Sequence, residues 1–234
     1  GLPPKAELGA FCAARLQRFA AARPFMAEAR LLAAPHARTS TPLLLDAVCG
    51  ADWIRVGDAA MAVDPLSGNG IFQALSSALQ APAVVNTLLK RPEHRALAQA
   101  FHSQRVSALF HRFARIGRDF YAQETRWPER PFWQARAVWP DAEALHVDVT
   151  PDKVAIARRP VLLNGFVTEA EVVVTPDQPL GVWHVEGLEM APLLAALRAD
   201  NGLAPEQVLR DRLGARAAQA PALLDWMRAQ GWLA

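Results

Sequence analysis

The chain has 234 residues, of which 52% are hydrophobic and 21% charged. This composition is typical of a globular protein that buries a core within one or two domains, and it excludes a disordered chain. The apolar runs are too short to cross a bilayer, so no membrane partner is expected. No signal peptide is visible, and the two cysteines, Cys12 and Cys49, form no Cys-x-x-Cys pair. We therefore expect a cytoplasmic protein with buried, inert thiols and without a metal site.

The net charge of +2 conceals an asymmetry along the chain. Residues 1–144 hold 17 Lys and Arg against 12 Asp and Glu, a net charge of +5. Residues 145–234 hold 8 against 11, a net charge of −3. Phosphate neutralisation supplies most of the affinity for nucleic acids, so the acidic tail argues against a nucleic-acid partner and favours a peptide or protein.

Hydrophobic spacing predicts the elements of the first part of the chain. A helix is expected over residues 4–22, ended by Pro24, and an extended segment over 29–40. A short buried strand is expected over residues 53–56. A long helix over 70–90 follows, kinked at Pro82, with its apolar positions at Ile71, Leu75, Leu79, Val85, Leu88 and Leu89. A second long helix is predicted over residues 93–123.

The pattern changes near residue 144. Short strands are predicted over residues 146–149, 154–157, 161–163 and 171–175, with turns at 164–165 and 177–179. Three helices follow, over 190–199, 205–213 and 221–230, and Gly231 is well placed to end the last. We predict two domains, 1–143 and 144–234, of which the second is a small α+β, winged-helix-like tail.

The segment from Trp53 to Ile71 carries the clearest chemical signal. A strand that ends in Gly57-Asp58 would present one carboxylate to hydroxyl groups. The loop before the long helix contains Gly68 and Gly70, which let a ligand approach the free N–H groups and the partial positive charge of a helix start. A polyol chain joined to an electron-poor ring would satisfy both features. The alternative is ordinary turn chemistry, with Asp58 only capping a turn.

This segment resembles the second flavin-binding motif of the FAD-dependent aromatic hydroxylase and flavin halogenase superfamily. The resemblance implies FAD as cofactor, with Asp58 on the ribityl chain and the loop beside the isoalloxazine ring. It also implies the fold class, α/β (α+β): the C-terminal part of a glutathione-reductase-like FAD-binding fold with long helices. The expected cofactor-binding residues are Gly57, Asp58, Pro65, Ser67, Gly68, Asn69, Gly70 and Ile71.

Residues 120–133 are also similar to the halogenase-like branch, in which a long helix ends in an aromatic Pro-Phe-Trp element. Plain packing of a helix end is the alternative for these aromatic residues. The resemblance covers about residues 1–140. The chain departs from the family because it contains no Gly-x-Gly-x-x-Gly unit for the ADP half of FAD. It is therefore expected to match the C-terminal part of a longer enzyme, with the N-terminal part as its partner.

The resemblance implies a flavin-dependent monooxygenase that hydroxylates an aromatic substrate with O2. The tail is similar to those of the subgroup that acts on a tryptophan of a partner polypeptide in quinone-cofactor biogenesis. No catalytic residue is assigned, because the cofactor carries out the difficult step. A flavin reductase is a candidate partner, although NAD(P)H could act directly. Two alternatives stay open, a non-catalytic binding or scaffold protein and a flavin-dependent halogenase.

Other candidate residues carry weaker signals. His102 and His111 are expected to be partly exposed helix residues, and Ser67 lacks a nearby base for a hydrolase. Trp226 and Trp232 are expected in the core of the tail. A basic stripe on the second long helix is either a solvated face or a docking surface for an acidic partner or phosphate, and consists of Arg112, Arg115 and Arg118.

Overall fold

A computed structural model describes residues 3–30, 32–199 and 202–234 of the chain. The chain divides into two units, Gly1–Ser40 and Thr41–Ala234, which we describe separately. Both belong to a mixed α/β protein that is mostly helical, with small sheets. None of the helices formed by the described residues combines the length and apolar character that a membrane span needs.

The first unit is less helical than its sequence predicts. It contains η1 (Lys5–Glu7), α1 (Leu8–Gln17) and α2 (Arg23–Met26). Pro24 lies in the first turn of α2 instead of ending the preceding helix, because a missing N–H costs nothing there. No described residue between 29 and 40 belongs to a strand, and Cys12 is exposed, so its predicted burial is wrong.

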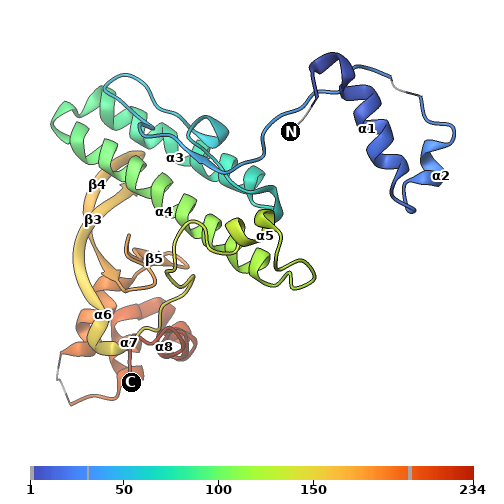
Figure 1. The fold of residues 1–234 in the computed structure, drawn as a ribbon. Helices are drawn as coiled ribbons and strands as arrows, with labels where there is room; N and C mark the ends of the chain where they lie inside the picture. Colours follow the sequence, from blue (N-terminus) through green and yellow to red (C-terminus); the bar gives the residue numbers. More distant parts are fainter. Residues whose placement is uncertain (1–2, 31, 200–201) are drawn as a thin grey trace. The chain divides into compact units, whose positions relative to one another are not determined.

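Two long helices dominate the second unit (Figure 1). They are α3 (Gly70–Lys90) and α4 (Arg95–Ala122), which follows the short η4 (Pro92–His94). The helix predicted over 70–90 is confirmed at both ends, and that over 93–123 within about a turn. Pro82 lies inside α3, and the helix continues past it.

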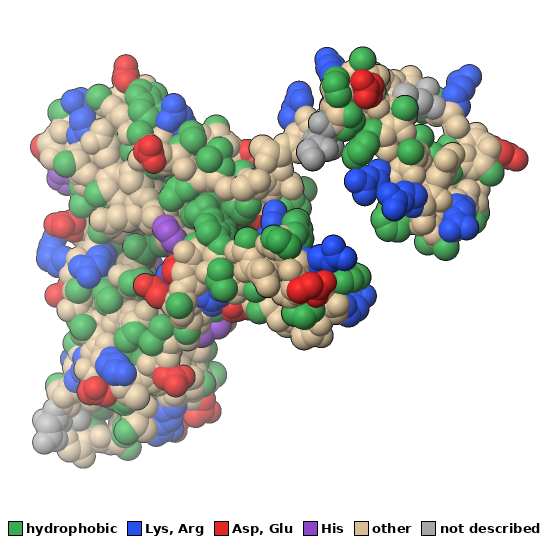
Figure 2. Space-filling view, viewed as in Figure 1, with side chains coloured by type: hydrophobic (Ala, Val, Ile, Leu, Met, Phe, Trp, Pro, Cys, Tyr) green, Lys and Arg blue, Asp and Glu red, His purple; other side chains and the backbone are tan. Residues whose placement is uncertain are grey.

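Most apolar positions of α3 are not buried. Ile71, Leu75 and Leu79 are 79%, 61% and 82% exposed, and Figure 2 shows hydrophobic side chains at the surface over α3. Leu88 is the one of the predicted apolar positions that is buried, and the other buried residues of this helix are Gln73, Ser77, Ala83, Val84 and Thr87. A polar face is buried because it meets the backbone of neighbouring segments, as shown below.

The segment before α3 is mostly irregular. β1 (Leu43–Leu44) pairs antiparallel with β2 (Met61–Ala62). The strand predicted over 53–56 is reduced to one bridge between Cys49 and Ile54, and it leads into η2 (Gly57–Ala59). This segment packs on α4 through a core of Val48, Ala60, Met61, Val106, Phe110 and Phe113.

A long hairpin follows α5 (Pro131–Arg136) and η5 (Pro151–Lys153). β3 (Ala155–Leu163) pairs with β4 (Phe166–Val174) in one ladder, so the two strands predicted over 154–163 are a single strand. Asn164 and Gly165 both have positive φ, as a tight type I′ turn requires. The strand predicted over 146–149 is not formed.

The turn end of the hairpin is fixed to α3 by two side chains. Thr87 Oγ1 accepts a hydrogen bond from the Val167 N–H (2.8 Å) and donates one to the Ala83 carbonyl oxygen (2.7 Å). Asn86 donates to the Gly165 carbonyl oxygen (3.1 Å). The burial of Thr87 is therefore explained by a backbone group that needs a partner.

The other end of the hairpin meets three helices, α6 (Met190–Arg198), α7 (Pro205–Leu213) and α8 (Ala220–Ala229), all confirmed within one residue of prediction. The small hairpin of β5 (His184–Val185) and β6 (Leu188–Glu189) precedes α6, and η6 (Gly214–Gln219) joins α7 to α8. Trp226 and Trp232 pack edge to face at 5.0 Å, and Trp232 is buried, which confirms its place in the core.

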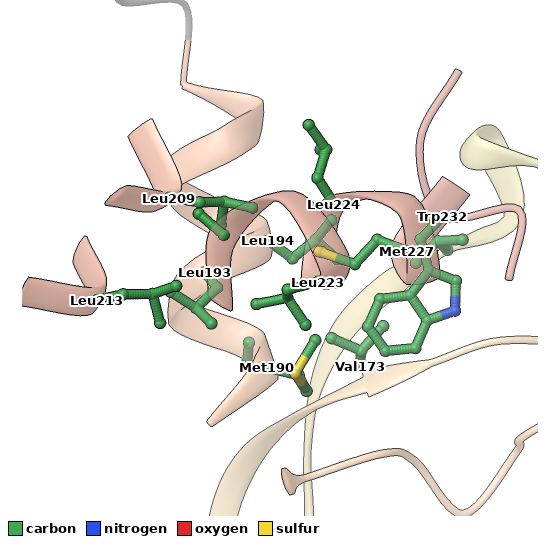
Figure 3. Close-up of a cluster of buried hydrophobic side chains, with 13 residues drawn as sticks. Val173, Met190, Leu193, Leu194, Leu209, Leu213, Leu223, Leu224, Met227 and Trp232 are labelled. Atoms are coloured by element: carbon green, nitrogen blue, oxygen red, sulfur yellow. The ribbon is translucent and has the colours of Figure 1, made fainter. Parts of the chain in front are cut away.

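These helices enclose a core of their own against β4 (Figure 3). Its buried members include Val173, Met190, Leu194, Leu209, Met227 and Trp232. Val167 of the same β4 belongs to a different core with Val84, Leu88, Ala98 and Phe101. The boundary near residue 143 stays a prediction.

We expect Gly231→Ala to destabilise the protein more than Gly202→Ala. Both glycines have positive φ (70° and 66°), which costs an alanine about 1–2 kcal/mol. At Gly231 a Cβ atom would also overlap the carbonyl oxygen of Val149, whereas at Gly202 it meets no atom of a described residue within 4 Å. Urea unfolding should show an additional loss of about 1–3 kcal/mol for Gly231→Ala. An equal loss of unfolding free energy in the two variants would contradict the packing of Val149 against the end of α8.

Candidate functional site

The loop that enters α3 is organised by Asp64. Its carboxylate oxygen Oδ1 accepts the Leu66 N–H (2.9 Å), and its carbonyl oxygen accepts the Ser67 hydroxyl (2.8 Å). This arrangement caps η3 (Pro65–Ser67), whose first residue is a proline with no N–H to satisfy. Gly68 follows in the left-handed conformation (φ 66°, ψ 5°), which favours glycine.

Asn69 turns the chain into the helix. Its side-chain amide donates to the Ser67 carbonyl oxygen (2.6 Å), and its own carbonyl oxygen accepts the Gln73 N–H (2.9 Å). The N–H groups of the first turn of α3 have no acceptor within the helix and are available to a ligand. A Cβ atom added at Gly68 or Gly70 would meet nothing within 4 Å, so the approach to these donors is open among the described residues.

Gly57 and Asp58 have different surroundings. Gly57 is buried with a φ of 55°, and its N–H donates to the Ser77 hydroxyl (2.9 Å). An added Cβ would lie 3.1 Å from the Ala74 Cβ, so a glycine allows η2 to pack closely on α3. Asp58 is exposed beside it and makes no hydrogen bond with another described residue. Its carboxylate is free to accept hydrogen bonds from ligand hydroxyls, and its role stays a prediction.

His102 supports the same segment from α4. Its Nε2–H donates to the Arg55 carbonyl oxygen (2.8 Å), two residues before Gly57. The side chain is buried, which lowers its pKa, so the expectation of a partly exposed His102 is wrong. The neutral imidazole holds the approach to η2 in place.

Tyr121 links the loop to the end of α4 and was not recognised from the sequence. Its hydroxyl donates to Asp64 Oδ2 (3.0 Å). Burial and then the Asp64 carboxylate raise the pKa of this phenol. Its ring packs on Phe132 and Trp133, and Trp133 stacks on Trp127 at 5.9 Å. The signal available in the sequence was that Tyr121 is the single tyrosine of the chain.

Gln73 is a second residue that the sequence did not single out. It lies in the first turn of α3, is 2% exposed, and its Nε2 has no hydrogen-bond partner among the described residues. A buried donor without a partner costs about 1–3 kcal/mol, so a ligand or water acceptor is expected beside it. Together with the open helix start, this fits the polar edge of a flavin ring. The described residues provide no glycine-rich strand–helix unit for the pyrophosphate.

The basic stripe on α4 is not a uniformly solvated face. Arg115 binds Asp141 through two hydrogen bonds of 2.9 Å and also pairs with Glu143. Arg118 donates to the carbonyl oxygens of Asp141 and Glu143, both at 2.7 Å. The Arg115 guanidinium lowers the pKa of Asp141. Two of the three arginines therefore fix the connection between α5 and the hairpin.

Two solved structures are similar to this chain. The first is the peptidyl tryptophan dihydroxylase QhpG, described as essential for tryptophylquinone cofactor biogenesis, with 54% identity over 99% of this chain and a TM-score of 0.79. The chain is homologous to the C-terminal half of this enzyme. It spans about half of that protein's length (53%). No protein-family model matches the chain, and no curated protein does.

The second structure is CmlS, a flavin-dependent halogenase. It is 14% identical, with a TM-score of 0.57 over 96% of this chain and 52% of CmlS. At this identity the similarity shows the fold alone. The relationship predicted from residues 53–71 and 120–133 is confirmed, and the fold corresponds to the C-terminal part of these enzymes.

We expect Tyr121 to titrate above the ordinary tyrosine pKa of about 10. Because the pKa of Tyr121 is higher in the folded than in the unfolded state, the protonated phenol stabilises the fold in full below the unfolded-state pKa. This stabilisation is lost as the pH rises through the folded-state pKa. Phenolate absorbance measures the shift directly, because Tyr121 is the only tyrosine. Asp64→Asn should lower the pKa partly, since the effect of burial remains, and Tyr121→Phe should remove the signal. An ordinary pKa in the unsubstituted protein would contradict the contact.

Proposed function

We propose that this chain forms the flavin-ring side of an FAD-dependent monooxygenase that hydroxylates a tryptophan residue in a polypeptide. The observation that carries the proposal is the 54% identity with QhpG over 99% of the chain. The loop 64–70 supports it, because the loop presents open helix N–H groups to a ligand. The fold similarity to a halogenase alone does not favour halogenation.

The residues of the site would have distinct tasks. Gly68 and Gly70 would admit the ring edge to the start of α3, where the N–H groups and helix dipole stabilise negative charge. Asp58 would accept hydrogen bonds from the ribityl hydroxyls, and Gln73 would donate to the ring. Pro65, Ser67, Asn69 and Ile71 would shape the loop around it. Bound FAD supplies the reduction of O2, by which one oxygen atom enters the substrate and the other leaves as water.

Activity would require the counterpart of the other half of QhpG. In that arrangement the chain completes a glutathione-reductase-like FAD-binding fold, and residues 144–234 form a winged-helix-like tail. The exposed stripe of Ile71, Leu75 and Leu79 supports a partner surface along α3, because apolar patches of this kind are usually covered. A flavin reductase as electron donor and a cytoplasmic location remain part of this proposal.

The function is tested with the intact protein, a reductant, O2 and a tryptophan-containing polypeptide. Mass spectrometry should find one or two added oxygen atoms on tryptophan, and none on a matched polypeptide with phenylalanine in its place. If the protein stays colourless after FAD is added, the proposal of a flavin enzyme is wrong and a non-catalytic scaffold protein is favoured.

We expect Gly70→Leu to weaken FAD binding about tenfold or more, because the side chain would fill the approach to the first turn of α3. We expect the fold to be unaffected, since a Cβ atom at this position meets no described residue within 4 Å. Ala229→Leu adds similar bulk at an exposed position of α8, outside the loop and α3, and serves as the control. Flavin fluorescence quenching measures affinity, and melting temperature checks folding. Equal affinity of both variants would exclude Gly70 from the site.

We also expect the 234 residues alone to bind FAD poorly. They offer contacts for the ring and ribityl chain but no anchor for the pyrophosphate. Equilibrium dialysis should show affinity at least about a hundredfold below that of the intact protein, on the scale of about 1.4 kcal/mol per factor of ten. Tight stoichiometric binding by this chain would show that the loop and α3 form a complete site.

A further inference from the structure

A cavity of about 640 Å³ lies between α4 and two loops of the tail. From α4 it is lined by Arg105, Leu109, Arg112 and Arg115, and from the loops by residues that include Leu145, Val147, Asp177 and Leu180. Its volume lies within the usual range of ligand-binding sites. No part of the proposed flavin site contributes to its lining.

The cavity opens on a different side of α4 from the flavin loop. Arg105, Leu109 and Arg112 recur at spacings of three and four residues and therefore share one helix face. Gly117, whose added Cβ would lie 3.8 Å from Asp64, falls on the face of Val106 and Phe113. At 3.6 residues per turn, the centres of the two faces are separated by roughly a quarter of a turn around the helix. The cavity is thus a separate site.

Its charges are incompletely paired. Arg115 is bound to Asp141 and Glu143. Asp177 Oδ1 accepts a hydrogen bond from the Val147 N–H (3.0 Å) and lies 3.3 Å from His146 Nδ1. By contrast, Arg105 and Arg112 form no ion pair or hydrogen bond with another described residue.

Arg105 is the more constrained of these two cations. Its Nε is buried without a partner among the described residues, and burial lowers its pKa. The guanidinium lies 5.8 Å from the Phe101 ring, its nearest aromatic contact. A partly buried cation without a counter-charge is costly, and an incoming carboxylate would supply both the charge and the acceptors.

We propose that this cavity is a docking site for an acidic segment of the polypeptide substrate. A carboxylate would bind between Arg105 and Arg112, and an adjacent apolar side chain would pack on Leu109, Leu145 and Leu180. This inference rests on the proposed function, because a polypeptide substrate is what the relative's description names. A polyphosphate chain fits less well, since Glu143 and Asp177 in the lining would repel a run of charges.

Binding is tested by fluorescence anisotropy on the intact protein with a labelled peptide of alternating Leu and Glu. A second peptide with Gln in place of Glu isolates the charge. The Glu peptide should bind at least about tenfold more tightly, in line with the strength of a charge-assisted pair. Arg112→Glu and Arg105→Gln should each lose this preference, and Arg112→Lys should retain most of it.

Arg95→Glu is the matched control, an exposed arginine of the same helix outside the cavity. Melting temperatures identify any variant that fails to fold. Unchanged binding by Arg112→Glu and Arg105→Gln would overturn the docking site. So would equal binding of the Glu and Gln peptides, or a short oligonucleotide that competes better than the Glu peptide.

Turnover separates this inference from the proposed function. With an acidic tryptophan-containing polypeptide, Arg112→Glu should raise KM about tenfold and leave kcat unchanged, because the site holds the substrate away from the reacting atoms. With a short neutral tryptophan peptide, both constants should stay unchanged. Absence of hydroxylation by the unsubstituted protein overturns only the proposed function if the charge-dependent peptide binding persists. Hydroxylation with an unchanged KM in the variants overturns only the docking site.

Discussion

A single carboxylate, Asp64, fixes the loop on which the candidate site depends. One of its oxygens caps η3, and the other accepts the Tyr121 hydroxyl at the end of α4. The open N–H groups of α3 can serve a ligand only if the loop keeps clear of them. Because Asp64 holds the loop from both sides, the helix start stays open without a ligand to order it. The aromatic cluster around Tyr121 in turn limits the motion of the phenol.

The buried face of α3 follows from the same demand for backbone partners. Ser77 accepts the N–H of Gly57 in η2, and Thr87 accepts the N–H of Val167 in β4, ten residues further along the helix. Both N–H groups belong to residues that are themselves buried, so leaving them unpaired would be costly. α3 thus holds η2 through Ser77 and the hairpin of β3 and β4 through Thr87. Apolar residues in place of Ser77 and Thr87 could not do this.

Local signals predicted most of the fold, and non-local contacts account for the rest. The ends of α3, the turn at Asn164–Gly165 and the stop at Gly231 depend on neighbouring residues, and the sequence contains those. Hydrophobic periodicity predicts the helix α3 but not its buried face, because Ile71, Leu75 and Leu79 are exposed whereas Ser77 and Thr87 are buried. The strand at 53–56 has few partners among the described residues. The loop residues of the candidate site stay a prediction based on the resemblance. The contact of Tyr121 with Asp64 was not predictable, because the two residues lie far apart along the chain.

The three arginines of α4 show why a charge pattern alone cannot assign a role. Arg112, Arg115 and Arg118 are spaced alike, yet Arg115 and Arg118 meet the loop at residues 141–143 while Arg112 faces the cavity beside Arg105. The loop supplies Asp141 and Glu143 at one end of the row only. Residues 144–147, which follow this loop, are Ala-Leu-His-Val and offer no carboxylate that could pair with Arg112. Of these three arginines, the one without an ion pair to a described residue is therefore Arg112, which lines the cavity together with Arg105, an arrangement that a carboxylate from another chain would complete.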